Sequence, residues 1–224
     1  MPLLLFREGY PSTVTDEQEF SRQEKRKGRT RAALIEAATA IVLTDGVGVA
    51  IQTITDKADV GFGSFYNHFA SKEALFTAVA HNALDQWEAE TAEVTSKYEE
   101  PVSRLTATLR LYVRMNKTHP EIARILNCTA PEMVEYPFEF SSNFQKTLEA
   151  LAARKVIDIK NVSLSVLAIR STLKQVLAIR EASPKFTDKE ADAVVEMMLV
   201  MLKIDGKTIQ RVMAERLPML PKKK

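Results

Sequence analysis

The sequence predicts an all-α protein in which a small N-terminal three-helix domain precedes a larger helical bundle. Only 7 glycines and 9 prolines occur in 224 residues, so few tight turns interrupt the chain. Apolar residues recur every three or four positions from residue 30 almost to the C-terminus, as they do along one face of a helix. No stretch of the sequence shows the sustained apolar-polar alternation of a half-buried strand. Together these observations favour helices throughout.

Residues 1–28 are expected to form a flexible arm, because their Pro, Ser, Thr and acidic residues follow no period. The end of the arm and the start of the next segment hold one acid, Glu24, against six cations: Arg22, Lys25, Arg26, Lys27, Arg29 and Arg31. The net charge of the chain is only +2, so contact with nucleic acid requires such a local concentration. The stretch either stays solvated or binds phosphates and enters a minor groove, with Arg29 the strongest candidate.

Four helical patterns follow the arm. They cover residues 30–44, 51–58, 62–69 and 71–97. Asp45 and Gly46 end the first, the run 59–61 ends the second, and Ser71 is a helix cap that starts the fourth. Two short helices joined by a glycine-containing turn are typical of a helix-turn-helix, whose second helix fits the major groove. Similar pairs also occur in ordinary bundles.

The sequence itself makes this interpretation more specific. Residues 54–75 read ITDKADVGFGSFYNHFASKEAL, and this run resembles the signature of the tetracycline repressor (TetR) family of DNA-binding regulators. The resemblance covers residues 29–76, and the rest of the chain is similar to the family only as a helical bundle of the right length. Two positions depart from the family pattern. Ala50 stands where a Ser or Thr cap is common, and Asp59 stands where a turn glycine is usual and adds a negative charge near the DNA face.

The chemistry of individual residues fits a groove-facing surface. Gly63 has no side chain where the helix must approach DNA closely, and Ser64 can donate or accept at a base edge or a phosphate. The resemblance implies a phosphate contact for the Tyr66 hydroxyl, although a tyrosine in a helix is often a core residue. Lys72 begins the fourth helix, where its charge and the helix dipole both attract phosphate. The predicted DNA-contacting residues are Arg29, Thr53, Phe62, Gly63, Ser64, Tyr66, Asn67, His68 and Lys72.

Two C-terminal helices are expected to form a dimer interface. On residues 162–182 one stripe consists of Leu164, Leu167, Ala168, Ser171 and Ala178, and another of Val166, Ile169, Leu173, Val176 and Leu177. One buried face cannot account for both stripes, and the helix over 188–204 is similarly apolar. We therefore expect a homodimer through a four-helix interface, as the resemblance also implies. A dimer places two recognition helices ~34 Å apart and requires a partly palindromic operator in double-stranded DNA.

The segment between these regions supplies candidates for a pocket that takes a small apolar effector. The candidates are Leu109, Tyr112, Met115, Asn116, Leu126, Phe138 and Phe144. Each of them fits an ordinary core position equally well, so the effector rests mainly on the resemblance. If the effector and the operator favour different conformers, each weakens binding of the other by the same factor.

The domain plan that follows has four parts. Residues 1–28 form the arm, 29–76 the helix-turn-helix domain, 77–216 the ligand-binding and dimerisation domain, and 217–224 a solvated tail. The alternative is a constitutive DNA-binding protein or a helical interaction protein without an effector.

Other classes of protein are disfavoured by what the sequence lacks. Its three histidines stand in no metal-ligand spacing and no phosphate loop or nucleophile motif occurs, so we expect no enzyme, cofactor or metal site. The single cysteine, Cys128, cannot form an intrachain disulfide and suits a reducing cytoplasm. The apolar run 193–202 is about half of the ~20 residues that a membrane span requires, so no membrane partner is expected.

Overall fold

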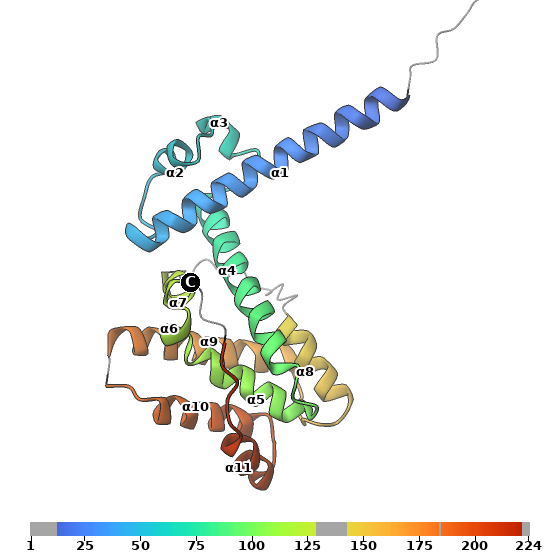
Figure 1. Cartoon of the computed structure of the whole chain (residues 1–224), viewed down its shortest axis with the longest axis vertical. Coiled ribbons are helices and arrows are strands. Elements are labelled where there is room, and N and C mark those ends of the chain that lie inside the picture. The colour runs from blue at the N-terminus through green and yellow to red at the C-terminus, as the bar shows by residue number, and fades with distance from the viewer. Residues whose placement is uncertain (1–12, 129–142, 184, 221–224) are drawn as a thin grey trace, which may run out of the picture.

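The computed structural model describes residues 13–128, 143–183 and 185–220 (Figure 1). Within these ranges all regular elements are helices, so the predicted all-α class is confirmed. The helices are α1 (Thr13–Thr44), α2 (Ile51–Lys57), α3 (Phe62–Phe65), α4 (Lys72–Thr95), α5 (Pro101–Tyr112), α6 (Met115–Thr118), α7 (Pro120–Cys128), α8 (Asn143–Ala153), α9 (Val162–Ala182), α10 (Asp188–Met201) and α11 (Gly206–Ala214).

The first three helices form the small N-terminal domain, as predicted. The helix α1 ends at Thr44, and Gly46 follows it with a φ of +74°, the left-handed conformation that glycine adopts most readily. The amides of Asp45 and Gly46 both donate to the carbonyl of Ile41, at 2.7 and 3.1 Å, and so close the end of the helix. The domain is held by an N-terminal core that continues into α4 and α7 and includes Leu34, Ile41, Ile54, Phe65, Phe69, Leu75, Phe76 and Trp87.

The start of α1 differs from the prediction. The apolar pattern indicated a helix from Thr30 after a flexible arm, whereas α1 begins at Thr13 and extends beyond the small domain (Figure 1). Residues 13–28 contain no proline and many good helix formers, which favour helix even without an apolar stripe. The periodicity failed to reveal this part, whose residues 22–28 are exposed. Residues 1–12 of the predicted arm lie outside the described residues.

The long helix α4 joins the small domain to the bundle. The hydroxyl of Ser71 accepts from the amide of Ala74 at 3.1 Å, which confirms Ser71 as the predicted N-cap. Near its start α4 buries Leu75 and Phe76 in the N-terminal core, and farther along it buries Trp87 and Thr91 beside the bundle. Figure 1 shows this helix running from one part of the molecule into the other. A shift of α4 would therefore be felt by both parts.

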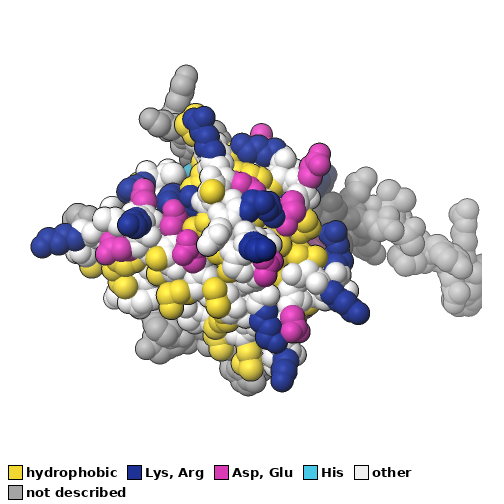
Figure 2. All heavy atoms as spheres, turned by 90° about the horizontal axis from the view of Figure 1, so that it is seen from below, with side chains coloured by type: hydrophobic (Ala, Val, Ile, Leu, Met, Phe, Trp, Pro, Cys, Tyr) yellow, Lys and Arg dark blue, Asp and Glu magenta, His cyan; other side chains and the backbone are white. Residues whose placement is uncertain are grey.

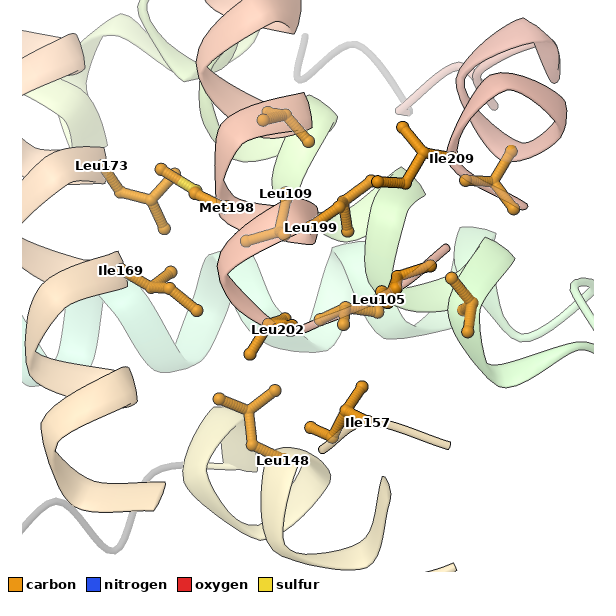
Figure 3. Close-up of a cluster of buried hydrophobic side chains, with 14 of the residues drawn as sticks. Leu105, Leu109, Leu148, Ile157, Ile169, Leu173, Met198, Leu199, Leu202 and Ile209 are labelled. Carbon is orange, nitrogen blue, oxygen red and sulfur yellow. The ribbon is translucent and has the colours of Figure 1, made fainter. Parts of the chain in front are cut away.

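The second part is a helical bundle with its own core. In Figure 3 side chains from α5, α8, α9, α10 and α11 meet in this bundle core, whose labelled members include Leu105, Leu109, Leu148, Ile169, Leu199 and Ile209. Ion pairs at the edge of this core link α10 to α5 and to the residues that follow it. Asp192 on α10 accepts from Arg110 and Arg114, with shortest N···O distances of 3.2 and 2.7 Å. These contacts hold α10 against the chain around the end of α5.

The C-terminal residues also differ from the prediction of a solvated tail. Residues 215–220 return along the bundle, where the hydroxyl of Tyr98 donates to the carbonyl of Arg216 at 2.7 Å. Pro218 is buried, and Leu217 and Leu220 pack against the N-terminal core. Their apolar side chains explain the difference, because packing removes them from water. Residues 221–224 of the predicted tail lie outside the described residues.

Candidate nucleic-acid interface and interior cavity

The turn between α2 and α3 has the geometry that a helix-turn-helix needs. The amide of Val60 donates to the carbonyl of Thr55 at 3.0 Å, and that of Ala58 donates to Ile54 at 3.0 Å. Asp59 lies between them with a φ of +53°. Aspartate tolerates this left-handed region better than most residues other than glycine. The turn is therefore made without the glycine whose absence put its geometry in question.

A side chain from α4 stabilises the loop just before α2. Ala50 occupies the N-cap position and provides no side-chain hydrogen bond, as its methyl group dictates. The ammonium of Lys72, at the start of α4, donates instead to the carbonyl of Val49 at 2.9 Å. An ammonium has three hydrogens, so Lys72 can keep this bond and still donate to a phosphate. The predicted phosphate ligand thus also fastens α4 to the loop before α2.

The helix α3 is amphipathic over a very short length. Phe65 is fully buried and Phe69 nearly so, whereas Phe62 is 46% exposed and Tyr66 is 53% exposed. The ring of Tyr66 stands edge-on to those of Phe62 and Phe65, with centroids 5.9 and 5.3 Å apart. These contacts hold the tyrosine outward with its hydroxyl free of the core. Phe62 therefore packs against Tyr66 and remains partly exposed.

Other predicted contact residues share this surface. A Cβ at Gly63 would meet no atom within 4 Å, so close approach there is open to a partner. Asn67 and Thr53 are exposed, and Ser64 and His68 are half-buried. The predicted helix 62–69 is shorter than expected, because α3 ends at Phe65 and the residues after it continue as hydrogen-bonded turns.

The basic stretch on α1 presents two different faces. The guanidinium of Arg31 lies 4.9 Å from the centre of the Phe69 ring. The pKa of His68 is lowered mainly by burial and further by the positive charges of Lys27 and Arg31. Lys27 and Arg31 therefore face the recognition helix. At 100° per residue Arg29 points about 160° away from either of them. The structure brings Lys27 and Arg31 to the candidate DNA surface and turns the predicted Arg29 away from it.

These two residues were absent from the predicted contacts, although a signal for them exists. Residues 27, 31, 34, 38 and 41 continue one helical stripe, whose last three members are buried in the N-terminal core. Extending that stripe toward the N-terminus would have identified the cations that lie over α3.

A cavity of about 630 Å³, partly open to solvent and here termed the interior cavity, lies among α4, α5, α8 and α9. Leu109, Tyr112 and Phe144, three of the predicted pocket residues, line it. Met115 is fully buried in the N-terminal core, and Asn116 donates to the carbonyl of Leu177 at 3.2 Å.

Leu126 packs against the N-terminal core rather than the cavity, and Phe138 lies outside the described residues. Met115, Asn116 and Leu126 do not line this cavity, because α6 and α7 turn toward the small domain after α5 ends.

The cavity wall also includes residues of α4 that the sequence did not indicate. Trp87 and Thr91 line it, and the ring of Trp87 stands edge-on to that of Tyr112 with centroids 5.2 Å apart. Burial raises the pKa of Tyr112 to about 12, so its hydroxyl stays protonated and can donate a hydrogen bond. Arg170 of α9 contributes a cation to the same wall. The described residues contain no cluster of three or more His, Cys, Asp or Glu side chains arranged for a metal ion.

A third surface of interest is the outer face of α9 and α10. Leu164 is 60% exposed, Met197 is 70% and Val200 is 62%. The stripe of α9 that contains Val166, Ile169 and Leu173 is buried, whereas the stripe of Leu164 is largely exposed, so the two predicted stripes lie on different faces. By length and composition alone α9 could also cross a membrane, but such a helix is weak evidence for a span. Figure 2 shows further hydrophobic side chains among charged ones at the bundle end.

A helix-turn-helix domain fused to a helical bundle defines the class of the protein as a helix-turn-helix DNA-binding regulator. Residues 34–79 match the family described as bacterial regulatory proteins, tetR family. The same region is 53% identical over 46 residues to the HTH-type transcriptional repressor DhaR of Mycobacterium sp. (strain GP1). That match covers 20% of this chain and 23% of the relative. Residues 34–79 are thus a tetR-family DNA-binding domain.

Solved structures extend the similarity of fold to most of the chain. RolR in complex with resorcinol is 23% identical with a TM-score of 0.60, covering 88% of this chain and all of that one. FadR of Bacillus subtilis in complex with stearoyl-CoA is 16% identical with a TM-score of 0.52, covering 76% and 96% of the two chains. At these identities the comparison shows a common architecture of small domain and bundle.

Proposed function

We propose that the chain is a homodimeric repressor that leaves a partly palindromic operator when a small apolar effector fills the interior cavity. The observation that carries this proposal is the course of α4. Its first residue, Lys72, holds the loop before α2, and its later residues Trp87 and Thr91 line the cavity. A molecule in the cavity therefore contacts the helix that positions the DNA-binding domain.

The DNA contacts follow from the exposed surface of the small domain. Gly63, Ser64 and Asn67 face base edges, while Tyr66 and Lys72 bind phosphates, as their chemistry favours. Lys27 and Arg31 add phosphate contacts beside α3. In domain terms residues 29–76 bind DNA and 77–216 bind the effector and the second subunit, with α4 shared by both.

The exposed apolar face of α9 and α10 supports the dimer. A soluble monomer rarely exposes several large apolar side chains such as Leu164, Met197 and Val200. Pairing two copies across a two-fold axis buries these side chains in a four-helix interface. It also presents two recognition helices to successive turns of one DNA groove, which a palindromic operator requires.

The cavity supports the effector. Its volume of about 630 Å³ lies within the range of small-molecule sites, and most of its wall is apolar. RolR and FadR, which share the fold, have been solved with resorcinol and stearoyl-CoA respectively. A protein of this kind acts on DNA in the cytoplasm and is not an enzyme.

The test is selection of genomic fragments by the purified protein at near-physiological salt, followed by a salt titration on the best fragment. We expect a short palindrome and a steep fall of affinity with salt, because several phosphates are neutralised. Absence of an enriched site would contradict the proposal and favour a helical interaction protein. A site whose affinity no small molecule changes would favour constitutive DNA binding.

A further inference from the structure

Two buried polar side chains of the cavity wall lack partners within the fold. Trp87 and Thr91 lie one helical turn apart on α4 and are 2% and 1% exposed. In the part of the chain that the structure describes, neither Nε1 of Trp87 nor Oγ1 of Thr91 has a hydrogen-bond partner. A buried donor without a partner destabilises the folded state. Because both residues line the cavity, a bound molecule can supply the missing partners.

Not every polar side chain on this face of α4 lacks a hydrogen-bond partner, as Thr95 shows. Thr95 also lines the cavity, is 2% exposed and lies one turn beyond Thr91. Its hydroxyl donates to the carbonyl of Thr91 at 2.8 Å, so its hydrogen-bonding capacity is used inside the helix. Thr91 and Thr95 therefore form a matched pair of the same residue type in the same wall.

The shape of the wall favours a flat ring. Three aromatic side chains, Trp87, Tyr112 and Phe144, come from three different helices. Trp87 and Tyr112 already meet edge to face, at an interplanar angle of 82°. A third ring beside them can adopt the offset or edge-on contacts that aromatic groups prefer. The remaining apolar wall includes Leu84, Leu105, Leu109, Leu151 and Leu173.

The charges beside Tyr112 favour a neutral molecule. Arg170 and Glu88 are the half-buried charges of the cavity wall, whereas Glu99, Arg104 and Arg154 on the same wall are exposed. Burial lowers the pKa of Arg170, while Tyr112 and Glu88 oppose that shift, so Glu88 offsets the guanidinium charge. An ion entering this pair would lose its hydration without a free counter-charge, which is unfavourable.

We propose that the cavity binds a neutral aromatic molecule with a hydroxyl or carbonyl oxygen that accepts from Nε1 of Trp87 and shares a hydrogen bond with Oγ1 of Thr91. This inference rests on the proposed function for the role of the cavity as an effector site. It adds the chemical class of the effector and the two residues that select it.

The experiment uses the full chain with two probes of similar size, 4-ethylphenol and ethylbenzene, of which only the first has an oxygen. Trp87 is the single tryptophan of the chain, so its fluorescence reports directly on the cavity. We expect 4-ethylphenol to shift this emission and to bind about 10-fold or more tightly than ethylbenzene, as two hydrogen bonds require. Equal affinities, or no binding of 4-ethylphenol, would overturn the proposal.

Variants assign the selectivity to the named atoms. Thr91→Val removes the hydroxyl at nearly constant volume and is expected to weaken 4-ethylphenol about 5- to 10-fold without weakening ethylbenzene. Thr95→Val is the matched control and should leave both affinities within about 2-fold, because its hydroxyl is already bonded. Trp87→Phe removes the fluorescent reporter, so its binding is measured by calorimetry. Like Thr91→Val, it is expected to weaken 4-ethylphenol without weakening ethylbenzene.

Thermal unfolding without ligand separates binding from folding. Thr91→Val is expected to melt no lower than the parent chain, since it removes a buried polar group without a partner. If Thr91→Val and Thr95→Val weaken 4-ethylphenol equally, the assignment to Thr91 is wrong. Binding of 4-ethylphenol with no release of operator DNA would uphold this inference and contradict the proposed function instead.

Discussion

The helix-turn-helix and the interior cavity obtain their functional residues in different ways. The candidate DNA surface comes mainly from one short segment around α3, where neighbours in sequence are neighbours in space. The cavity wall comes from four helices whose lining residues are spread from Leu84 to Leu173. The first kind of site can be found from a local motif, whereas the second exists only after the bundle has packed. The predictions below challenge or refine this contrast.

The largest effect is expected from the core beneath the recognition helix. Phe65→Ala should lower the free energy of unfolding by ~3–5 kcal/mol and abolish DNA binding, because Phe65 is fully buried and positions α3. Denaturant unfolding and operator titration measure the two effects. Phe62→Ala is the control, since this exposed ring should change stability by less than about 1 kcal/mol. Similar losses of stability in both variants would refute the division of α3 into buried and exposed faces.

A charge on the apolar face of α9 and α10 should separate the subunits. Met197→Asp is expected to produce a monomer with an operator affinity on the order of 100-fold lower, because simultaneous contact with two half-sites is lost. Sedimentation measures the mass, and DNA titration measures the affinity. Met219→Asp places the same charge on another exposed methionine and should remain dimeric. A dimeric Met197→Asp protein would show that the interface lies elsewhere.

The two basic faces of α1 should differ in DNA binding. Arg31→Ala is expected to weaken operator binding by about 5- to 10-fold and to reduce the salt slope by about 1, as loss of one phosphate contact does. Arg29→Ala should have the smaller effect, because Arg29 points away from the side of α1 that carries Arg31 over Phe69. Salt titrations of both variants provide the comparison. A larger loss for Arg29→Ala would restore the prediction made from sequence.

Substitutions around α3 and at the start of α4 should distinguish residues that set the overall affinity for DNA from residues that set the preferred DNA sequence. Tyr66→Phe and Lys72→Ala are expected to weaken all operators by similar factors, whereas changes at Ser64 or Asn67 should alter the preferred sequence. Binding to a library of operator variants measures both quantities. An unchanged preference in the Ser64 and Asn67 variants would remove these residues from base recognition.

The smallest expected effect concerns the missing cap of α2. Ala50 has extended backbone angles that suit a capping side chain, and Ala50→Ser should raise the free energy of unfolding by ~0.5–1 kcal/mol. Denaturant unfolding measures this change, and the operator preference should stay the same. A loss of stability would mean that the hydrogen bond from Lys72 to Val49 leaves no room for a serine hydroxyl at position 50.

The sequence predicted those parts of the fold that a local pattern determines. The end of α1 just before Gly46 and the cap at Ser71 follow from the conformations that Gly46 and Ser71 favour. The helical residues 13–28 were missed because the prediction relied on an apolar stripe, which their sequence lacks. The return of residues 215–220 depends on contacts with distant helices that no local pattern encodes.

The same division holds for the candidate sites. The exposure of Tyr66 and the role of Lys72 at the start of α4 were accessible from the motif. Trp87 and Thr91 were not found, because only the folded bundle shows that this part of α4 borders a cavity. Met115 and Asn116 were assigned to the pocket because the end of α5 at Tyr112 was not foreseen.

The central claim is that occupancy of the cavity and DNA binding oppose each other through α4. The most direct measurement is calorimetric titration of the full chain with 4-ethylphenol, with and without a saturating operator fragment. The reciprocal titration measures operator affinity with and without saturating 4-ethylphenol. We expect the operator to weaken the binding of 4-ethylphenol by the same factor by which saturating 4-ethylphenol weakens the binding of the operator, as linkage requires. Affinities that do not change in either direction would contradict the claim.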